Sequence, residues 1–224
     1  MNAPPDDAPS VGVVVLAYGA EPGLGACADS VLASVGVRAH LVVVDNGTEA
    51  TDVLDRMRSA QAGGGPVTVV GSGVNLGYSG GNNLGAAHAP GEYLALVNSD
   101  AVLDPDALAR LAAVAARPEV GLAGGGIRLI DRPDLLNSGG NEVHFCGYSW
   151  CGDYERPAAE LPAERPVVSL MGATVLLRRA VWDEVGGFDD HYFAYHEDVD
   201  LSFGCRLRGY EVRWVRDAVV LHAY

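Results

Sequence analysis

Tyr93-Leu94-Ala95-Leu96-Val97-Asn98-Ser99-Asp100 is the stretch of this 224-residue chain that decides its fold class. Five largely apolar residues in a row predict a strand buried on both faces, as in a parallel sheet. Polar residues follow at once, and Asp100 stands at the carboxyl end of the strand, where open α/β sheets bind ligands. A carboxylate placed there, close to a diphosphate, can hold Mg²⁺ or Mn²⁺ through oxygen.

The sequence around this stretch alternates between predicted strands and helices. Apolar runs predict strands, and helical spacings predict helices, over residues 11–18 (strand), 24–35 (helix), 40–44 (strand), 49–62 (helix), 67–70 (strand), 82–88 (helix), 104–117 (helix) and 120–130 (strand). This β-α-β-α order predicts an α/β fold with a mostly parallel central sheet flanked by helices.

The second half of the sequence is less regular. Four prolines and several glycines interrupt any period over 131–166, so we expect loops and short strands there. Further elements are predicted over 169–177 (strand), 179–185 (helix), 201–208 (helix) and 212–214 (strand). We therefore expect a single domain over 11–224 with an irregular second half, preceded by a disordered tail over 1–10.

The composition limits the partners of the protein. Aspartate and glutamate number 29 against 15 basic residues, and this excess argues against a nucleic-acid surface. It does not argue against nucleotides, because loop amides or a bound cation can neutralise a diphosphate, and acidity can also serve solubility alone. No signal peptide or apolar stretch of transmembrane length is present, so we expect a cytoplasmic protein whose membrane association, if any, is peripheral.

The four cysteines show no zinc-type pairing. Cys146 and Cys151 lie close enough in sequence to form a local bridge. Reduced thiols in a cytosolic protein are the favoured interpretation, because two of the four cysteines fall in predicted helices.

A second acidic stretch, Phe193-Ala194-Tyr195-His196-Glu197-Asp198-Val199-Asp200-Leu201, places three carboxylates beside aromatic residues. One carboxylate could take a proton from an acceptor hydroxyl, as general-base chemistry requires. The alternative is that the acids compensate the orphan amides of a helix N-terminus. That alternative explains one or two of the acids but leaves Phe193, Tyr195 and His196 without a reason.

Three further motifs have two interpretations each. Asp45-Asn46-Gly47 could contact a base or ribose, or form a turn. The loop over 71–85 is rich in Gly and Asn and could present amides to a phosphate at a helix N-terminus, or it could be structural. His222 follows an apolar run, and a lone histidine at a strand end is more often structural than a metal ligand.

Taken in this order, the motifs resemble the family 2 glycosyltransferases with a GT-A fold, particularly their rhamnosyltransferase-like group. The resemblance covers nearly the whole chain and is carried by residues 13–18, 43–48, 75–77, 80–85, 96–100, 172–173, 176–179, 186–189 and 197–201. Any one of these blocks is weak, but together and in register they are specific.

The resemblance implies an inverting transfer of a sugar from a dTDP- or UDP-sugar, assisted by Mg²⁺ or Mn²⁺, to a polysaccharide or glycolipid acceptor. It assigns residues 11–130 to the nucleotide-sugar-binding half and 131–224 to the acceptor and catalytic half. Asp198 looks like the base and Glu197 like its supporting acid, while Asp100 and His222 resemble the metal ligands. The resemblance further implies donor contacts from Tyr18, Asp45, Asn75, Gly77, Gly81, Asn82, Asn98 and Asp100, and acceptor contacts from Gly172 and Ala173.

Two departures from the family pattern keep other functions open. Val102 stands where the family has the second acid of its metal motif, and the chain stops at Tyr224, where relatives usually continue. A non-catalytic nucleotide- or sugar-binding module is therefore an alternative, as is an excised domain. A nucleotidyltransferase is less favoured, because residues 19–23 contain no basic residue for a triphosphate. The catalytic interpretation requires that Asp100 and the pair Glu197/Asp198 lie on opposite sides of one cleft.

Overall fold

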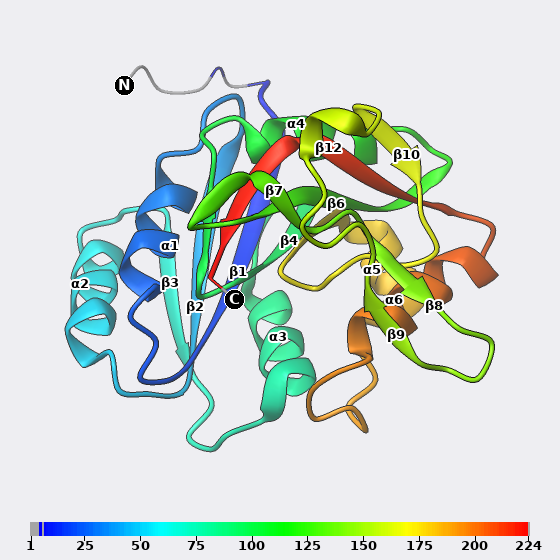
Figure 1. Cartoon of the computed structure of the whole chain (residues 1–224). Coiled ribbons are helices and arrows are strands. Elements are labelled where there is room, and N and C mark those ends of the chain that lie inside the picture. The colour runs from blue at the N-terminus through cyan, green and yellow to red at the C-terminus, as the bar shows by residue number, and fades with distance from the viewer. Residues whose placement is uncertain (1–4, 6, 224) are drawn as a thin grey trace.

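The computed structural model describes Pro5 and residues 7–223, which form a central mixed sheet covered by helices on both faces (Figure 1). The strands are β1 (Ser10–Gly19), β2 (Arg38–Thr48), β3 (Val67–Gly71), β4 (Tyr93–Asn98), β5 (Ala101–Leu103), β6 (Val120–Leu129), β7 (Arg132–Ser138), β8 (Asn141–Val143), β9 (Ser149–Cys151), β10 (Glu164–Pro166), β11 (Thr174–Arg178) and β12 (Glu211–His222). The helices are α1 (Leu24–Leu32), α2 (Thr51–Ala62), α3 (Gly77–His88), α4 (Ala107–Ala115), α5 (Arg179–Val185), α6 (Glu197–Leu207) and the 3₁₀ turn η1 (Ala158–Glu160).

The sheet runs in the order β10-β12-β6-β11-β4-β1-β2-β3. The pairs β4-β1, β1-β2, β2-β3 and β12-β6 are parallel, whereas β11 is antiparallel to both of its neighbours. The chain leaves β1 toward β2 on one side, while β4 lies on its other side. This arrangement makes the carboxyl ends of β1 and β4 a topological switch point, where a crevice forms. The expected α/β sheet flanked by helices is confirmed.

Alternation along the buried strands divides the core into two layers. Val11, Val13 and Val15 pack with α1, α2 and α4 on one face, whereas Val14 packs with α3, α5 and α6 on the other. Each apolar residue added to these layers stabilises the fold by removing apolar area from water, at roughly 25 cal/mol per Å². The core therefore fixes the strand ends that carry the polar residues of the crevice.

Several predicted boundaries differ from the structure. The helix expected over 82–88 begins at Gly77, because Gly81 and Gly85 let α3 lie directly against β1, where a Cβ would collide with Leu16 and Val14. The low helix propensity of glycine is overridden by this close packing. The helix expected over 104–117 is shorter, because α4 begins after its N-cap Asp106 and ends at Ala115. The strand expected over 169–177 begins only at Thr174.

The last strand is the largest difference. A strand was expected over 212–214, but β12 continues to His222, pairing in parallel with β6 and antiparallel with the unexpected strand β5. In this register His222 lies opposite Ala101, next to the end of β4. The irregular segment 131–166 contains the short strands β7 to β10 and η1, as its composition indicated.

The remaining expectations concern the tail and the cysteines. Residues 1–4 and 6 of the expected disordered tail lie outside the described residues, while Ala8 is buried and Ser10 begins β1. All four cysteines are free thiols, so the alternative bridge between Cys146 and Cys151 is not formed. Among the described residues, none of the helices combines the length and the apolar character that crossing a bilayer requires.

Candidate functional site

Three adjoining cavities form one cleft along the carboxyl ends of β1, β2 and β4. The central cavity, of about 510 Å³, lies over the ends of β1 and β4. It shares Tyr18, Asn46 and Asn75 with an outer cavity of about 300 Å³ beside β2. On its other side it shares Tyr78, Asn98, Ala194 and Tyr195 with a carboxylate cavity of about 290 Å³, which is lined by Glu197 and Asp198.

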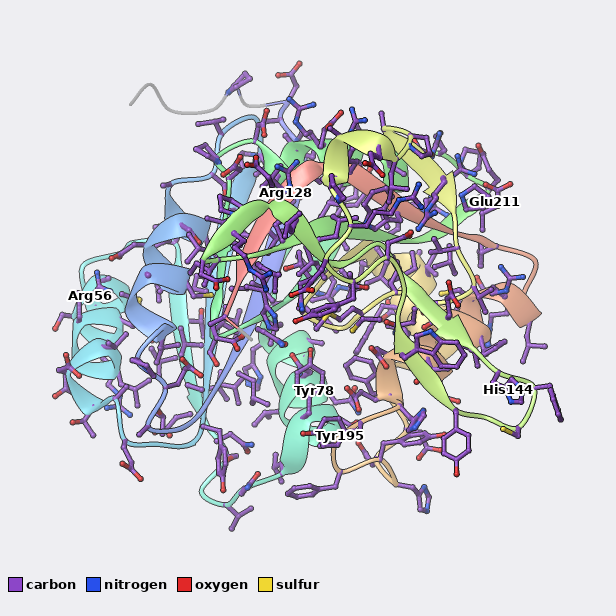
Figure 2. All side chains as sticks on the ribbon, viewed as in Figure 1. Arg56, Tyr78, Arg128, His144, Tyr195 and Glu211 are labelled. Atoms are coloured by element: carbon purple, nitrogen blue, oxygen red, sulfur yellow. The ribbon has the colours of Figure 1, made fainter. Side chains whose placement is uncertain are left out.

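The cleft places Asp100 and the pair Glu197/Asp198 as the sequence interpretation required. Asp100 lines the central cavity and the acidic pair lines the adjoining carboxylate cavity. Figure 2 shows Tyr78 on α3 and Tyr195 on the loop before α6 close to each other, where the two cavities meet.

Asp100 and His222 meet at the edge of the central cavity. His222 Nε2 lies 3.2 Å from Asp100 Oδ1 and 3.5 Å from Asn98 Nδ2, and its Nδ1 lies 3.0 Å from Asn137 Oδ1. The imidazole is buried, and Asn137 is completely buried on β7. When Asn137 Oδ1 accepts the Nδ1 proton, Nε2 turns its lone pair toward the Asp100 carboxylate. Two electron-pair donors then face one point.

These two residues fit a divalent cation as part of its ligand set. A carboxylate oxygen and an imidazole nitrogen 3.2 Å apart can both reach one ion at ordinary metal–ligand lengths, roughly 2.0–2.2 Å. The described residues contain no cluster of three or more His, Cys, Asp or Glu side chains able to hold a metal. Asp100 and His222 are therefore an incomplete ligand set, and a bound cation would need further ligands, such as water or substrate oxygens.

The charges of the cleft support the same interpretation. The chain contains no lysine, and among the described residues no arginine lines any of its three cavities. The central cavity contains the carboxylates of Glu21 and Asp100 instead. A diphosphate bound there would be repelled unless a cation neutralised it, because like charges in a partly buried site repel strongly. The donor set and the charge balance thus both fit a divalent cation.

Asp198 is held by hydrogen bonds from three sides. Its Oδ2 accepts from the Gly172 amide at 3.0 Å and from Asn141 Nδ2 at 3.3 Å, and its Oδ1 accepts from the Val199 amide at 2.8 Å. Burial raises the pKa of Asp198, and these hydrogen bonds act in the opposite direction. The carboxylate is thus fixed in orientation and keeps a lone pair on Oδ1.

Glu197 has the opposite environment. It is buried as the first residue of α6, and its Oε2 has no hydrogen-bond partner among the described residues. Burial raises the pKa of Glu197 to about 7, with the adjacent Asp198 carboxylate adding to the effect. Near neutral pH a substantial fraction of Glu197 is therefore protonated.

Tyr78 connects the two parts of the cleft. Its hydroxyl lies 3.1 Å from Asn98 Oδ1 and 3.0 Å from the Gly172 carbonyl. Burial raises the pKa of the phenol, so that it remains neutral. Through these contacts the end of β4 is joined to the segment that carries Gly172 and Ala173, both of which line the carboxylate cavity.

Asp45 lies in the outer cavity with Tyr18 and Asn75. Its Oδ1 accepts from the amides of Gly47 and Thr48 at 3.2 and 3.3 Å, and its Oδ2 lies 3.5 Å from an Arg58 nitrogen. Asp45 therefore forms the turn that the sequence suggested and also faces the cavity, so that the two interpretations do not exclude each other.

Three backbone amides at the start of α3 already have hydrogen-bond acceptors within the protein. The amides of Leu76 and Gly77 donate to Asn46 Oδ1 and Asn75 Oδ1 at 2.8 Å, and the Tyr78 amide donates to the Phe193 carbonyl at 2.6 Å. These three amides are thus occupied by side chains and by the neighbouring loop, and this part of the loop has the structural role that was the alternative interpretation. Asn75 and Gly77 still line the central cavity.

Two of the expected donor-binding residues lie away from the described cavities. Gly81 packs against the Leu16 side chain, and buried Asn82 donates from Nδ2 to the Tyr78 carbonyl within α3. Neither residue lines any of the three cavities. Their positions fit a role in packing α3 against β1.

Sequence reasoning missed four polar residues of the cleft: Asn46, Tyr78, Asn137 and Asn141. Asn46 and Tyr78 lie inside motifs that were recognised, and each directly follows a residue that was predicted to bind the donor, Asp45 and Gly77. Asn137 and Asn141 fall in the irregular segment, where only the tertiary fold brings them to His222 and Asp198.

The fold is that of the GT-A glycosyltransferases. The structure is similar to that of GalNAc-T7 with UDP, GalNAc and Mn²⁺, with a TM-score of 0.79 and 15% identity, over 98% of this chain and 45% of that one. It is also similar to the mannosyltransferase PcManGT from Pyrobaculum calidifontis in complex with GDP-Man and Mn²⁺, with a TM-score of 0.70 and 20% identity, over 100% of this chain and 59% of that one.

The chain belongs to the glycosyltransferase-like family 2, whose model matches residues 8–223. It is 32% identical over 180 residues to the N-acetylglucosaminyl-diphospho-decaprenol L-rhamnosyltransferase of Mycobacterium tuberculosis, covering 70% of this chain and 58% of that protein. It is 29% identical over 191 residues to the uncharacterized protein y4gI of Sinorhizobium fredii, covering 82% of this chain and 21% of that protein. The chain thus matches a fifth to somewhat more than half of the length of these relatives.

Proposed function

We propose that the protein transfers a sugar from a nucleotide-diphosphate donor to a glycan or glycolipid hydroxyl, with inversion at the anomeric carbon. The observation that carries the proposal is the single cleft in which Asp100 and His222 lie beside one cavity and Asp198 beside the next. The donor nucleoside would occupy the outer cavity with Asp45 and Tyr18, and its diphosphate the central cavity.

In the proposed reaction, the acceptor oxygen forms a bond to the anomeric carbon while the bond from that carbon to the diphosphate oxygen breaks. The proton of the acceptor hydroxyl passes to Asp198, which its hydrogen bonds to Gly172 and Val199 hold in one orientation. A raised pKa makes Asp198 a stronger base than an exposed aspartate. A single displacement of this kind inverts the anomeric centre and needs no covalent intermediate.

The proposal assigns the cation to Asp100 and His222. When bound, Mn²⁺ or Mg²⁺ would neutralise the diphosphate and the charge that develops on it as a leaving group. Asn98 and Asn137 orient the imidazole toward that position. Because one ligand is an imidazole nitrogen, Mn²⁺ fits this set better than Mg²⁺ does.

The donor sugar and the acceptor follow from relatives alone. Rhamnose is proposed as the donor sugar because of the similarity to the mycobacterial L-rhamnosyltransferase. A cell-surface polysaccharide or glycolipid is proposed as the acceptor because of the same enzyme and of a second relative. This relative is the O-antigen biosynthesis protein RfbC of Myxococcus xanthus, which is 31% identical over 149 residues. We propose a cytoplasmic location, where nucleotide sugars are available, with peripheral contact to the membrane.

The test separates donor binding from chemistry. Calorimetry with UDP and dTDP should show binding that Mn²⁺ strengthens, and Asp100→Ala should remove this strengthening. Asp198→Asn should abolish transfer from the cognate nucleotide sugar and leave nucleotide binding nearly intact. Asp106→Ala is the matched control, because Asp106 pairs with Arg110 at the start of α4 and lines none of the three cavities.

Two results would contradict the proposal. An absence of nucleotide binding in every metal condition would remove the donor site. Normal turnover by Asp198→Asn would remove Asp198 from the role of base. Nucleotide binding without turnover of any nucleotide sugar would favour the non-catalytic binding module instead.

A further inference from the structure

A fourth cavity, of about 350 Å³, lies beside the cleft and is used by none of the roles assigned above. We call it the flanking cavity. It is enclosed by the hairpin of β8 and β9, the loop before α6, and the first two turns of α6. Its volume falls within the range of small-ligand sites.

Neighbouring residues of one short stretch of backbone line the flanking cavity and the carboxylate cavity in turn. Tyr195 lines the carboxylate cavity and His196 the flanking cavity, while in α6 Glu197 and Asp198 line the former and Val199 and Asp200 the latter. Tyr195 and His196 have φ values of 71° and 72°, in the left-handed region that residues with a side chain rarely adopt. Such strain is typical of functional sites, where the surrounding structure maintains it.

The side chains of the flanking cavity have the chemistry of a carbohydrate site. Tyr192 and Phe203 supply aromatic surface, against which the C–H faces of a sugar ring can pack. Asp200 is exposed and, among the described residues, its carboxylate accepts no hydrogen bond and pairs with no cation, so it is available to hydroxyl groups. Burial raises the pKa of Asp200, with Asp189 adding to the effect.

The charge of this cavity excludes an anionic ligand. No arginine is among the described residues that line it, and the chain has no lysine. A phosphate or an anionic lipid headgroup would meet the Asp200 carboxylate, with no arginine or lysine among the described lining residues to compensate its charge. A neutral ligand with many hydroxyl groups suits an aromatic wall beside an unpaired carboxylate.

β8 contacts Asp198 at one of its residues and lines the flanking cavity at another. Asn141 donates to Asp198 in the carboxylate cavity, and Val143, two residues along the same strand, lines the flanking cavity. Two residues of a strand span roughly 6.6 Å. This spacing is of the order of one sugar unit, so a chain of sugars with its terminal hydroxyl at Asp198 could place the next unit here.

From this arrangement we infer that the flanking cavity is a subsite for the acceptor, and that it binds the neutral sugar unit next to the one that is glycosylated. The inference rests on the proposed function, since it takes Asp198 as the reacting group. Tyr192, Asp200 and Phe203 would then make the protein prefer acceptors of at least two sugar units. None of these three residues touches the reacting atoms.

The test compares disaccharides with monosaccharides. Ligand-observed NMR titrations would use methyl rhamnoside, methyl N-acetylglucosaminide, and disaccharides built from the same units. UDP or dTDP with Mn²⁺ is kept present, so that the donor cavities are filled. Wild-type protein should bind at least one disaccharide more tightly than its component monosaccharides. Phe203→Ala and Asp200→Asn should each weaken disaccharide binding by about tenfold, as the loss of a central contact does, with monosaccharide binding unchanged.

The control is Phe145→Ala. Phe145 lies near the tip of the same hairpin, is 95% exposed and does not line the flanking cavity, so its removal should change neither titration. Nucleotide binding should be normal in all three variants, which shows that they fold.

The inference is overturned if the variants bind disaccharides as wild type does, or if wild type binds no saccharide of the panel although it binds nucleotide. An equal loss of disaccharide binding in Phe145→Ala would show that the effect is not specific to the flanking cavity and would overturn it as well. Failure of nucleotide binding in wild type would instead count against the proposed function, so that the two failures are distinguishable.

Discussion

At the scale of single residues, Glu197 couples stability to pH. Its pKa of about 7 lies well above that of an exposed glutamate, so between roughly pH 4.5 and 7 the folded protein binds more protons than the unfolded chain. The unfolding free energy contributed by Glu197 therefore decreases as pH rises through this window. Below it both states are protonated and no penalty exists, whereas above it the folded state must hold a buried charge.

We expect Glu197→Gln to remove this contribution, which is on the order of 3 kcal/mol across the window. Urea unfolding at several pH values between 4.5 and 8 would measure it as the difference in slope between variant and wild type. A uniform offset from the new amide would not affect that difference. Identical pH slopes for the two proteins would show that the carboxylate is solvated in the folded state.

Asn137 is a second residue whose effect is indirect. It accepts from His222 Nδ1 and is completely buried, so we expect it to fix the tautomer that exposes Nε2 to a metal. Asn137→Leu should lower the affinity for Mn²⁺ by about 10–100-fold, the usual loss when such a partner is removed. Titration of free Mn²⁺ by electron paramagnetic resonance, in the presence of UDP, measures this without reference to turnover.

The conservative change distinguishes orientation from mere packing. Asn137→Asp keeps an acceptor opposite Nδ1 and should keep Mn²⁺ affinity near that of wild type. If both substitutions weakened Mn²⁺ binding equally, Asn137 would have only a packing role.

At the scale of elements, the N-terminus of α3 carries the loop that closes the cleft. Gly77 has a φ of 71°, and a Cβ there would collide with the carbonyl oxygen of Phe193, which accepts from the Tyr78 amide at 2.6 Å. Asn83 adds further contacts, since its side-chain amide donates to the Phe188 carbonyl and to Asp190. Glycine is therefore required at position 77 for the loop to dock.

We expect Gly77→Ala to release the loop over 189–196, lowering global stability by roughly 1–3 kcal/mol through strain and lost contacts. Limited chymotrypsin digestion should then cut at Phe193 and Tyr195, which are exposed, far faster than in wild type. Gly71→Ala is the matched control, because a Cβ at Gly71 meets nothing within 4 Å. Equal digestion rates for the two variants would mean that the loop does not depend on Gly77.

The same scale shows where sequence reasoning succeeds and where it ends. The strand ending at Asn98 follows from a local apolar run, so the position of Asp100 could be predicted. The contact between Asp100 and His222 could not, because it depends on the pairing of β12 with β5, a three-residue strand with no pattern of its own. The hydrogen bond from the Leu76 amide to Asn46 could not be predicted either, because Asn46 belongs to β2 and meets this loop only in the folded protein.

At the scale of the whole molecule, the α/β architecture was predictable because each buried strand is long and strongly apolar. The mixed character of the sheet could not be predicted, because β11 has an apolar run like those of β4 and β6 although it is antiparallel to both. Two core layers hold the strand ends in place, and the cleft lies where the connections diverge. The outer cavity is lined by the first half of the sequence alone, whereas the central cavity and the carboxylate cavity take residues from both halves.

The pairing of β12 has a consequence for how the protein becomes competent during synthesis. Asn98 and His222 meet across 124 positions of the chain, so the imidazole reaches the crevice only after β12 has left the ribosome and joined the sheet. A nascent chain that has folded its first strands holds Asp100 without this nitrogen. The proposed cation site is therefore complete only once β12 has joined the sheet.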